Sequence, residues 1–342
     1  MTTKHASHYN ELGFDLKFDS NPSLRQITME NLGGLFNPSS PEMEAMADLT
    51  YYTIAISAVI LGIIVIAVAY IIIRYRKKPD EDGEPYQDFG SIKIELVWTA
   101  IPIAIVAVLF LLTCSTMKAV DPPAGDREPD IVIIGHQWWW EIRYPASGVM
   151  TANEVHIPVG EKLLARLESI DVIHDFWVPE LGRKIDLVPG HPNYMWLVAG
   201  EPGVYIGACA EFCGDQHANM RIRVVAEPEA DFEKWTDEQL VVPSTPTAGI
   251  AGEGAKLFQT MACMNCHTIR GTAAAARVGP DLTHLADRAT IGAGVLTNTP
   301  ENLAKWLANP QRYKQGSLMP NMKLSDSEVK SIVAYLEALN EQ

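Results

Sequence analysis

The chain carries two long apolar runs in its N-terminal third. Residues 50–73 and residues 96–117 contain no charged side chain. Runs of about 20 apolar residues are long enough to cross a lipid bilayer as helices. A pair of buried helices in a soluble protein fits two such runs poorly. We therefore predict a membrane-spanning helical hairpin over residues 49–118.

Basic residues predict the orientation of this hairpin. The connecting segment 74–95 holds five Lys or Arg residues, whereas residues 28–49 hold none. Because Lys and Arg accumulate on the cytoplasmic side of membrane proteins, the connecting segment is expected to be cytoplasmic. The N-terminus and everything after Lys118 are then outside the cytoplasm.

Short alternating patterns follow the hairpin. Residues 131–134 are apolar, and positions 220–224 alternate between apolar and basic side chains. Turn signals such as Val-Pro-Gly and Glu-Pro-Gly separate these runs. The pattern predicts a small antiparallel β-sandwich or barrel of about 110 residues, within residues 119–241.

The two ends of the chain differ in character. Residues 1–48 are polar, contain Asn-Pro-Ser breakers and lack an apolar core of signal-peptide length, so we expect a loose tail with at most one short helix. Residues 242–248 have the composition of a linker. After it, in residues 249–342, the pattern becomes helical and ends in an amphipathic helix that a Ser325–Glu328 capping box begins.

Charge and cysteine content narrow the chemistry. The net charge is −15, and acidic residues strongly outnumber basic ones in residues 120–240. This acidity argues against nucleic acid and suits a cationic partner, although a solvated acidic face is the commoner explanation. Apart from Cys114 in the second apolar run, the cysteines form two close pairs. Such pairs are typical of metal or cofactor ligands rather than of disulfides.

The first pair belongs to a loop of soft ligands. Cys209 and Cys213 are followed by His217 and Met220, and His174 lies upstream. A Cys2His2 zinc site or a lone disulfide is compatible with the spacing. The thioether shifts the prediction toward copper, because thioether is a poor zinc ligand and suits copper.

The second pair belongs to a haem-attachment motif. Cys263-Met-Asn-Cys266-His267 has the C-x-x-C-H spacing of covalent haem c. A thioredoxin-like dithiol is the rival, but no βαβ pattern surrounds the motif. A second axial ligand is expected from Met319, which a stiffening proline follows, with Met322 in reserve.

With these motifs the chain closely resembles subunit II of haem–copper cytochrome c oxidases, in the class that carries a fused C-terminal cytochrome c domain. The resemblance covers residues 50–342 and leaves the first 48 outside. It implies a multidomain membrane protein: a two-helix transmembrane hairpin, a cupredoxin-like antiparallel β-sandwich and an all-α class I cytochrome c domain. In that domain Pro280 would accept a hydrogen bond from His267, and the helix before the motif would pack on the last helix.

The resemblance also implies a ligand set. A dinuclear copper centre, CuA, would be held by His174, Cys209, Glu211, Cys213, His217 and Met220. The two cysteines would bridge the coppers, each histidine would bind one of them, and Met220 would be a weak ligand. Glu211 would ligate through its carbonyl and turn its carboxylate to a magnesium ion shared with subunit I. No ligand is missing, which disfavours the quinol-oxidising relatives that have lost copper.

Two further roles are implied. Trp138 matches the tryptophan of an aromatic surface patch through which cytochrome c delivers electrons, although Trp139 and Trp140 also suit a core aromatic cluster. Glu95 matches a glutamate at the mouth of a proton channel in subunit I. Without the resemblance, Glu95 would be an ordinary charge at a helix end.

The expected function is electron input to a proton-pumping terminal oxidase of a prokaryotic respiratory chain. Electrons from cytochrome c or another donor would be relayed by way of haem c and CuA to subunit I, which reduces O2 to water. The chain would lie in the cytoplasmic (inner) membrane, its metal domains periplasmic, bound to lipid and other oxidase subunits. A CuA-bearing subunit of a nitric oxide reductase, a membrane-anchored carrier without a catalytic partner and a zinc-bound adaptor are the alternatives.

Overall fold

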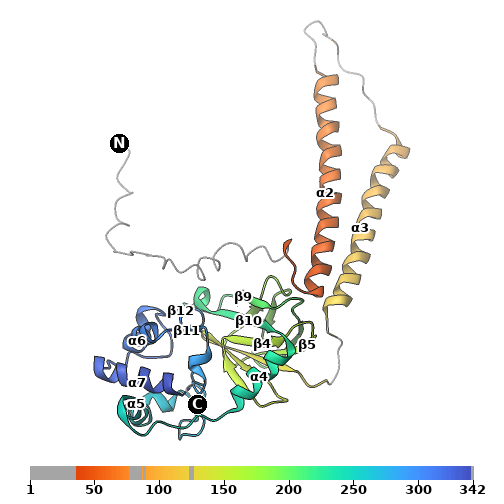
Figure 1. Ribbon diagram of the computed structural model, residues 1–342. Helices are drawn as coiled ribbons and strands as arrows, with labels where there is room; N and C mark the ends of the chain where they lie inside the picture. Colours follow the sequence, from red (N-terminus) through yellow and green to blue (C-terminus); the bar gives the residue numbers. More distant parts are fainter. Residues whose placement is uncertain (1–35, 77–82, 84–86, 88–89, 123–126, 340–342) are drawn as a thin grey trace, which may run out of the picture.

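The computed structural model describes residues 36–76, 83, 87, 90–122 and 127–339. These residues form a helical hairpin, a two-sheet β-sandwich and a small helical domain, in chain order (Figure 1). The hairpin projects from one side of the sandwich, and the helical domain packs beside the sandwich away from the hairpin. The predicted three-part fold is confirmed.

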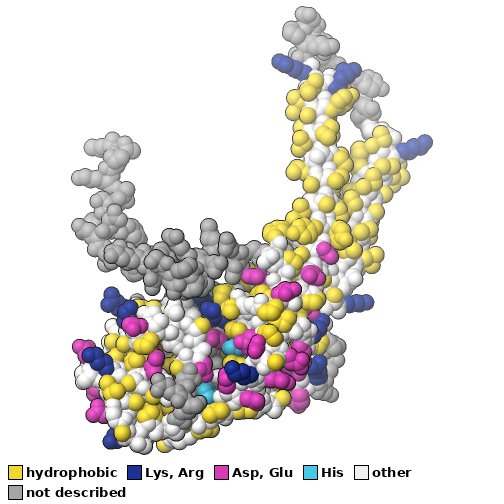
Figure 2. Space-filling view, viewed as in Figure 1, with side chains coloured by type: hydrophobic (Ala, Val, Ile, Leu, Met, Phe, Trp, Pro, Cys, Tyr) yellow, Lys and Arg dark blue, Asp and Glu magenta, His cyan; other side chains and the backbone are white. Residues whose placement is uncertain are grey.

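The hairpin consists of α2 (Pro41–Arg74) and α3 (Ile92–Val120). In the most apolar stretch of each helix, none of the residues is buried inside the protein. Figure 2 shows an almost continuous apolar surface over both helices, with basic side chains at the end far from the sandwich. Exposed apolar surface of this extent suits a lipid environment.

Helix α2 begins within the stretch predicted as a loose tail, residues 1–48. Ser40 caps its first turn and donates its hydroxyl to the carbonyl of Leu181, at 2.7 Å. The buried carboxylate of Glu42 forms an ion pair with Lys162, at 2.6 Å. This end of the predicted tail is therefore anchored to the sandwich, and the rest lies outside the described residues.

The sandwich contains two five-stranded sheets, with strand orders β3-β2-β1-β5-β8 and β4-β10-β9-β6-β7. The strands are β1 (Ile131–His136), β2 (Trp139–Arg143), β3 (Met150–Ala152), β4 (Glu154–Pro158), β5 (Leu163–Ser169), β6 (His174–Trp177), β7 (Ile185–Leu187), β8 (Asn193–Leu197), β9 (Gly203–Cys209) and β10 (Arg221–Glu227). Most neighbours are antiparallel, but β1 pairs with β5 and β10 with β4 in parallel. The sheets are therefore mixed, because these partners are joined by crossovers rather than by tight turns.

Alternating side chains build the core between the sheets. Along β10, Ile222 and Val224 are buried while Arg221 is exposed, as the sequence pattern predicts. Trp140 and Phe176 meet edge to face at 5.9 Å in the centre. The core thus closes directly beneath the strand ends that carry the metal-ligand candidates.

Helices and short strands complete the fold. They are α4 (Glu229–Leu240) against the sandwich and, in the helical domain, α5 (Gly249–Thr260), η3 (Ala262–Asn265), η4 (Leu285–Asp287), β11 (Thr290–Ile291), β12 (Leu296–Thr297), α6 (Pro300–Ala308), η5 (Pro310–Arg312) and α7 (Asp326–Ala338). The predicted capping box of Ser325 and Glu328 is present at the start of α7. Helices α5 and α7 pack closely, as expected, where Gly254 faces the Ser331 carbonyl.

Replacing Gly254 should separate these two helices. An ideal Cβ there would lie 1.9 Å from the Ser331 carbonyl oxygen, which belongs to rigid backbone. Overpacking of this kind costs about 1–3 kcal/mol, so Gly254→Ala should lower the melting temperature of the helical domain, measured by circular dichroism. Gly62→Ala in α2, where a Cβ meets nothing within 4 Å, is the matched control. An unchanged melting temperature for Gly254→Ala would contradict this packing.

Candidate metal centre and cofactor crevice

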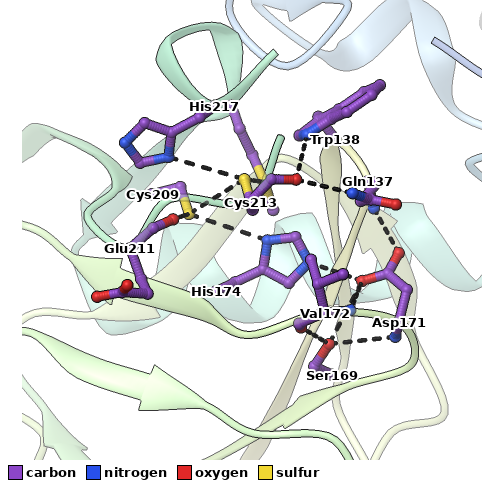
Figure 3. Close-up of polar contacts among 11 residues, drawn as sticks. Gln137, Trp138, Ser169, Asp171, Val172, His174, Cys209, Glu211, Cys213 and His217 are labelled. Atoms are coloured by element: carbon purple, nitrogen blue, oxygen red, sulfur yellow. Dashed lines mark hydrogen bonds and ion pairs between the residues drawn. The ribbon is translucent and has the colours of Figure 1, made fainter. Parts of the chain in front are cut away.

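Five soft side chains converge at one end of the sandwich (Figure 3). The Sγ atoms of Cys209 and Cys213 lie 3.7 Å apart. The Nδ1 of His174 lies 3.9 Å from the first sulfur, and the Nδ1 of His217 lies 3.7 Å from the second. The Sδ of Met220 approaches the Cys213 sulfur at 3.9 Å. Strand β6, strand β9 and the segment between β9 and β10 therefore bring His174 together with ligands that are more than 30 residues away in the sequence.

The arrangement of the histidines favours two metal ions over one. His174 and His217 lie on opposite sides of the cysteine pair, each next to a different sulfur (Figure 3). A single tetrahedral zinc would gather both imidazoles and both sulfurs around one centre. Two ions that share the sulfurs would each have one histidine, and thiolate, imidazole and thioether together suit copper.

The two thiols lie within hydrogen-bonding distance of each other. This contact lowers the pKa of Cys209 and raises the pKa of Cys213. Cys209 is therefore the more acidic of the two thiols. Because cysteines bind metal as thiolates, metal uptake is pH-dependent.

Asp171 fixes the orientation of His174. Its carboxylate accepts hydrogen bonds from Nε2 of His174 at 2.8 Å and from the backbone N–H of Gln137 at 2.7 Å. Although burial raises the pKa of Asp171, these hydrogen bonds hold it below its usual range. The proton on Nε2 leaves Nδ1 free for a metal. Sequence reasoning missed Asp171, although an acidic residue three positions before a ligand histidine is a usable signal.

The C-x-x-C-H motif lies on a separate crevice in the helical domain. His267 donates from Nδ1 to the Pro280 carbonyl at 2.8 Å, as expected, which leaves Nε2 free. Burial lowers the pKa of His267, so the imidazole is neutral and able to bind iron. A Cβ on Gly279 would lie 2.5 Å from this ring, so only glycine fits there. Cys263 and Cys266 line the same crevice.

The crevice suits a flat apolar group. Its lining is mostly apolar, and both Met319 and Met322 contribute to it. Gln311 donates to the Met319 carbonyl at 2.7 Å and so holds that segment in place. The donor set on the two sides, imidazole and thioether, is that of an electron-transfer haem.

Trp138 lies between the metal cluster and the crevice. It is only 9% exposed, donates from Nε1 to the Cys213 carbonyl at 2.9 Å, and also lines the crevice. The expected surface patch is therefore covered by the chain's own helical domain. Trp140 is a fully buried core residue, whereas Trp139 is partly buried and stacks on His136 at 4.0 Å. Of the two tryptophans for which a core aromatic cluster was the alternative interpretation, Trp140 is therefore a core residue.

The two glutamates lie apart from each other. The Glu211 carbonyl faces the Cys209 sulfur at 3.2 Å, and its exposed carboxylate points away from the cluster (Figure 3). Glu95 is in the first turn of α3, at the end of the hairpin far from the sandwich. The structure thus gathers the other predicted site residues into two groups, the metal-ligand cluster and the haem-attachment crevice, with Trp138 between them. Glu95 lies at the opposite side of the predicted membrane layer.

A lipid-exposed hairpin, a thiolate–imidazole cluster and a haem-attachment crevice define a membrane-bound electron-transfer protein. The sequence matches three family models: cytochrome c oxidase subunit II, transmembrane domain, over residues 28–115; its periplasmic domain over 147–227; and cytochrome c over 251–340. The chain belongs to the cytochrome c oxidase subunit II family. The first match begins at residue 28, so part of the tail expected to lie outside the family lies inside it.

Named relatives agree with this placement. Cytochrome c oxidase subunit 2 of Alkalihalophilus pseudofirmus is 39% identical over 317 residues, which is 91% of each chain. The same subunit of Bacillus subtilis is 30% identical over 322 residues, covering 88% of this chain and 90% of the relative. Quinol oxidase subunit 2 of Bacillus cereus is 31% identical over 209 residues, covering 60% and 72%.

The family has direct consequences for this chain. It implies copper in the sandwich, haem in the helical domain, and further oxidase subunits as partners. The chain is a two-pass membrane protein whose C-terminal part is outside the cell, and it is the subunit through which a terminal oxidase receives electrons. Neither the nitric oxide reductase nor the free carrier is favoured.

Removing the charge of Asp171 should weaken copper binding. In Asp171→Asn the side-chain amide can donate to His174 instead of accepting, which disfavours the tautomer with a free Nδ1. We expect an affinity for copper about 10–100-fold lower, measured by competition with a chelator. Asp237→Asn, an exposed change in α4, is the control. Equal copper retention in both variants would show that packing alone orients His174.

Proposed function

We propose that this chain receives electrons at its helical domain from cytochrome c or another respiratory donor. It would pass them to its sandwich domain and on to subunit I, where O2 is reduced to water and protons are pumped. The position of Trp138 carries this proposal, because one side chain lines the haem crevice and donates a hydrogen bond to the metal loop.

The cofactors are assigned as follows. Cys209 and Cys213 would bridge two coppers, with His174 and His217 on one each, the Met220 sulfur nearby and the Glu211 carbonyl completing the set. Bound copper and haem supply one-electron redox chemistry. Strand ends and hydrogen bonds would hold these residues in place, which suits a centre whose coordination has to change little during electron transfer.

The second cofactor would be attached covalently to Cys263 and Cys266. His267 is its proposed axial ligand on one face and Met319 on the other. The hydrogen bond from Gln311 to the Met319 carbonyl supports this choice over Met322.

Glu211 and Glu95 would serve the contact with subunit I. The exposed Glu211 carboxylate is free to bind a magnesium ion shared with that subunit. Glu95, at the predicted cytoplasmic end of α3, suits the mouth of a proton channel. The membrane is proposed to be the cytoplasmic (inner) membrane of a prokaryote.

We further propose that the functional units follow the predicted boundaries. These are a tail (1–48), the hairpin (49–118), the copper domain (119–241), a linker (242–248) and the haem domain (249–342). The structure adds that Ser40 and Glu42, near the end of this tail, contact the copper domain.

Cys213→Ser tests the proposed route. In the assembled oxidase this variant should lose near-infrared copper absorption and stop oxygen consumption from an external donor, while haem c still becomes reduced. Cys114→Ser, which changes a cysteine in α3 away from the site, should leave both properties intact. Oxygen consumption that survives in Cys213→Ser would refute the relay.

The axial ligand is tested by two methionine variants. Met319→Ala should lower the haem midpoint potential sharply, because loss of a thioether ligand removes its stabilisation of reduced iron. Met322→Ala should leave the potential nearly unchanged. Redox titration of the haem absorption band distinguishes the two, and the reverse pattern would reassign the ligand to Met322.

A further inference from the structure

A buried lysine of the haem domain donates hydrogen bonds to backbone carbonyls of the copper domain. Lys314 follows η5 and is only 3% exposed. Its Nζ donates to the carbonyls of Trp138 at 2.6 Å, Asn219 at 2.7 Å and Gly292 at 2.9 Å. Two of these three acceptors belong to the copper domain, and Asn219 lies in the metal loop between His217 and Met220.

A buried glutamate makes the reciprocal contact. Glu154 of the copper domain is also 3% exposed. Its carboxylate accepts hydrogen bonds from the backbone N–H groups of Ala289 at 3.0 Å and Thr290 at 3.2 Å, both in the haem domain. In each domain, a buried charged side chain thus forms hydrogen bonds with backbone groups of the other domain.

Burying these charges requires one particular docking geometry. An ammonium or carboxylate removed from water is strongly destabilising unless hydrogen bonds replace its hydration. Burial lowers the pKa of Lys314, which reflects this cost, and the three carbonyl acceptors match the three N–H donors of the ammonium form. Two of the three carbonyls that accept from Lys314, and both backbone N–H groups that donate to Glu154, belong to the other domain. A rotated or shifted haem domain would therefore remove these partners from both charges.

The acceptors of Lys314 are themselves part of the proposed route. Trp138 lies between the two sites, and Asn219 lies in the metal loop, where His217 and Met220 flank it. Gln216 adds a contact beside them, donating to the Gln315 carbonyl at 2.7 Å. The lysine therefore fixes the haem domain at the point where electrons would cross.

We propose that Lys314 is a positioning residue for electron transfer between the two domains. Its ammonium holds the haem crevice against Trp138 and the metal loop in a single orientation, with Glu154 as the reciprocal contact. This inference rests on the proposed function, because it concerns the rate of the step between haem c and copper.

The test is the rate of internal electron transfer in the assembled oxidase, followed optically after photoreduction of haem c. Lys314→Met keeps the length of the side chain and removes its charge. We expect a rate about tenfold lower or more, corresponding to loss of the docked population, and a new dependence on solvent viscosity. Lys330→Met, at an exposed position of α7, should match the wild type.

Two further readouts separate docking from folding. The haem and near-infrared copper spectra of Lys314→Met should remain those of the wild type. Hydrogen exchange at Ala289 and Thr290 should become faster, because their N–H groups lose Glu154 when the domains separate. If Lys314→Met fails to incorporate haem, Glu154→Gln disrupts the same docking from the copper domain and is measured in its place.

The outcomes are distinguishable. A rate within about twofold of the wild type and independent of viscosity, with Cys213→Ser still inactive, would overturn the role of Lys314 and leave the proposed function intact. Continued oxygen consumption in Cys213→Ser would overturn the proposed function itself. A slow, viscosity-dependent rate with intact spectra supports the inference.

Discussion

The carbonyl of Cys213 is the point on which the rest of the site depends. It accepts two hydrogen bonds, from Nε2 of Gln137 at 2.7 Å and from Nε1 of Trp138 at 2.9 Å. The backbone N–H of Gln137 in turn donates to Asp171, which orients His174. Two consecutive residues after β1 therefore couple both halves of the ligand set, although the halves come from different strands.

This coupling explains why the site lies on a β-sandwich. Strands restrict the backbone at the bases of the ligand loops, and the core residues Trp140 and Phe176 pack directly below. Gly135 at the end of β1 lets His174 approach, since a Cβ there would lie 2.6 Å from the imidazole. The protein's own contacts thus hold the ligand side chains in place, as a centre with little change between oxidation states requires.

The membrane hairpin is also fixed to the sandwich by specific contacts. Ser40 and Glu42 at the start of α2 contact the sandwich through a hydrogen bond and an ion pair. Arg183 forms a further ion pair with Asp121 at the foot of α3. The hairpin therefore sets the orientation of the copper domain relative to the bilayer, and with it the face turned to other subunits.

The sequence predicted those parts of the protein whose chemistry is local. The C-x-x-C-H motif, the Cys209–Met220 loop and the capping box of Ser325 each lie within a dozen residues, and apolar runs marked both membrane helices. The parallel pairing of β1 with β5 and the hydrogen bond from Gln137 to Asp171 depend on which segments meet in space. No sequence pattern marks Lys314 for the same reason, because its acceptors are up to 176 residues away.

Long-range contacts also change the role expected for Trp138. By the family resemblance, it was expected to belong to an aromatic surface patch through which cytochrome c delivers electrons. In the folded chain it is 9% exposed, and Lys314 of the haem domain is bonded to its carbonyl. An external donor cannot contact a covered residue without first displacing the haem domain. In the proposed relay, electrons from an external donor would therefore pass by way of the haem domain while the two domains are docked.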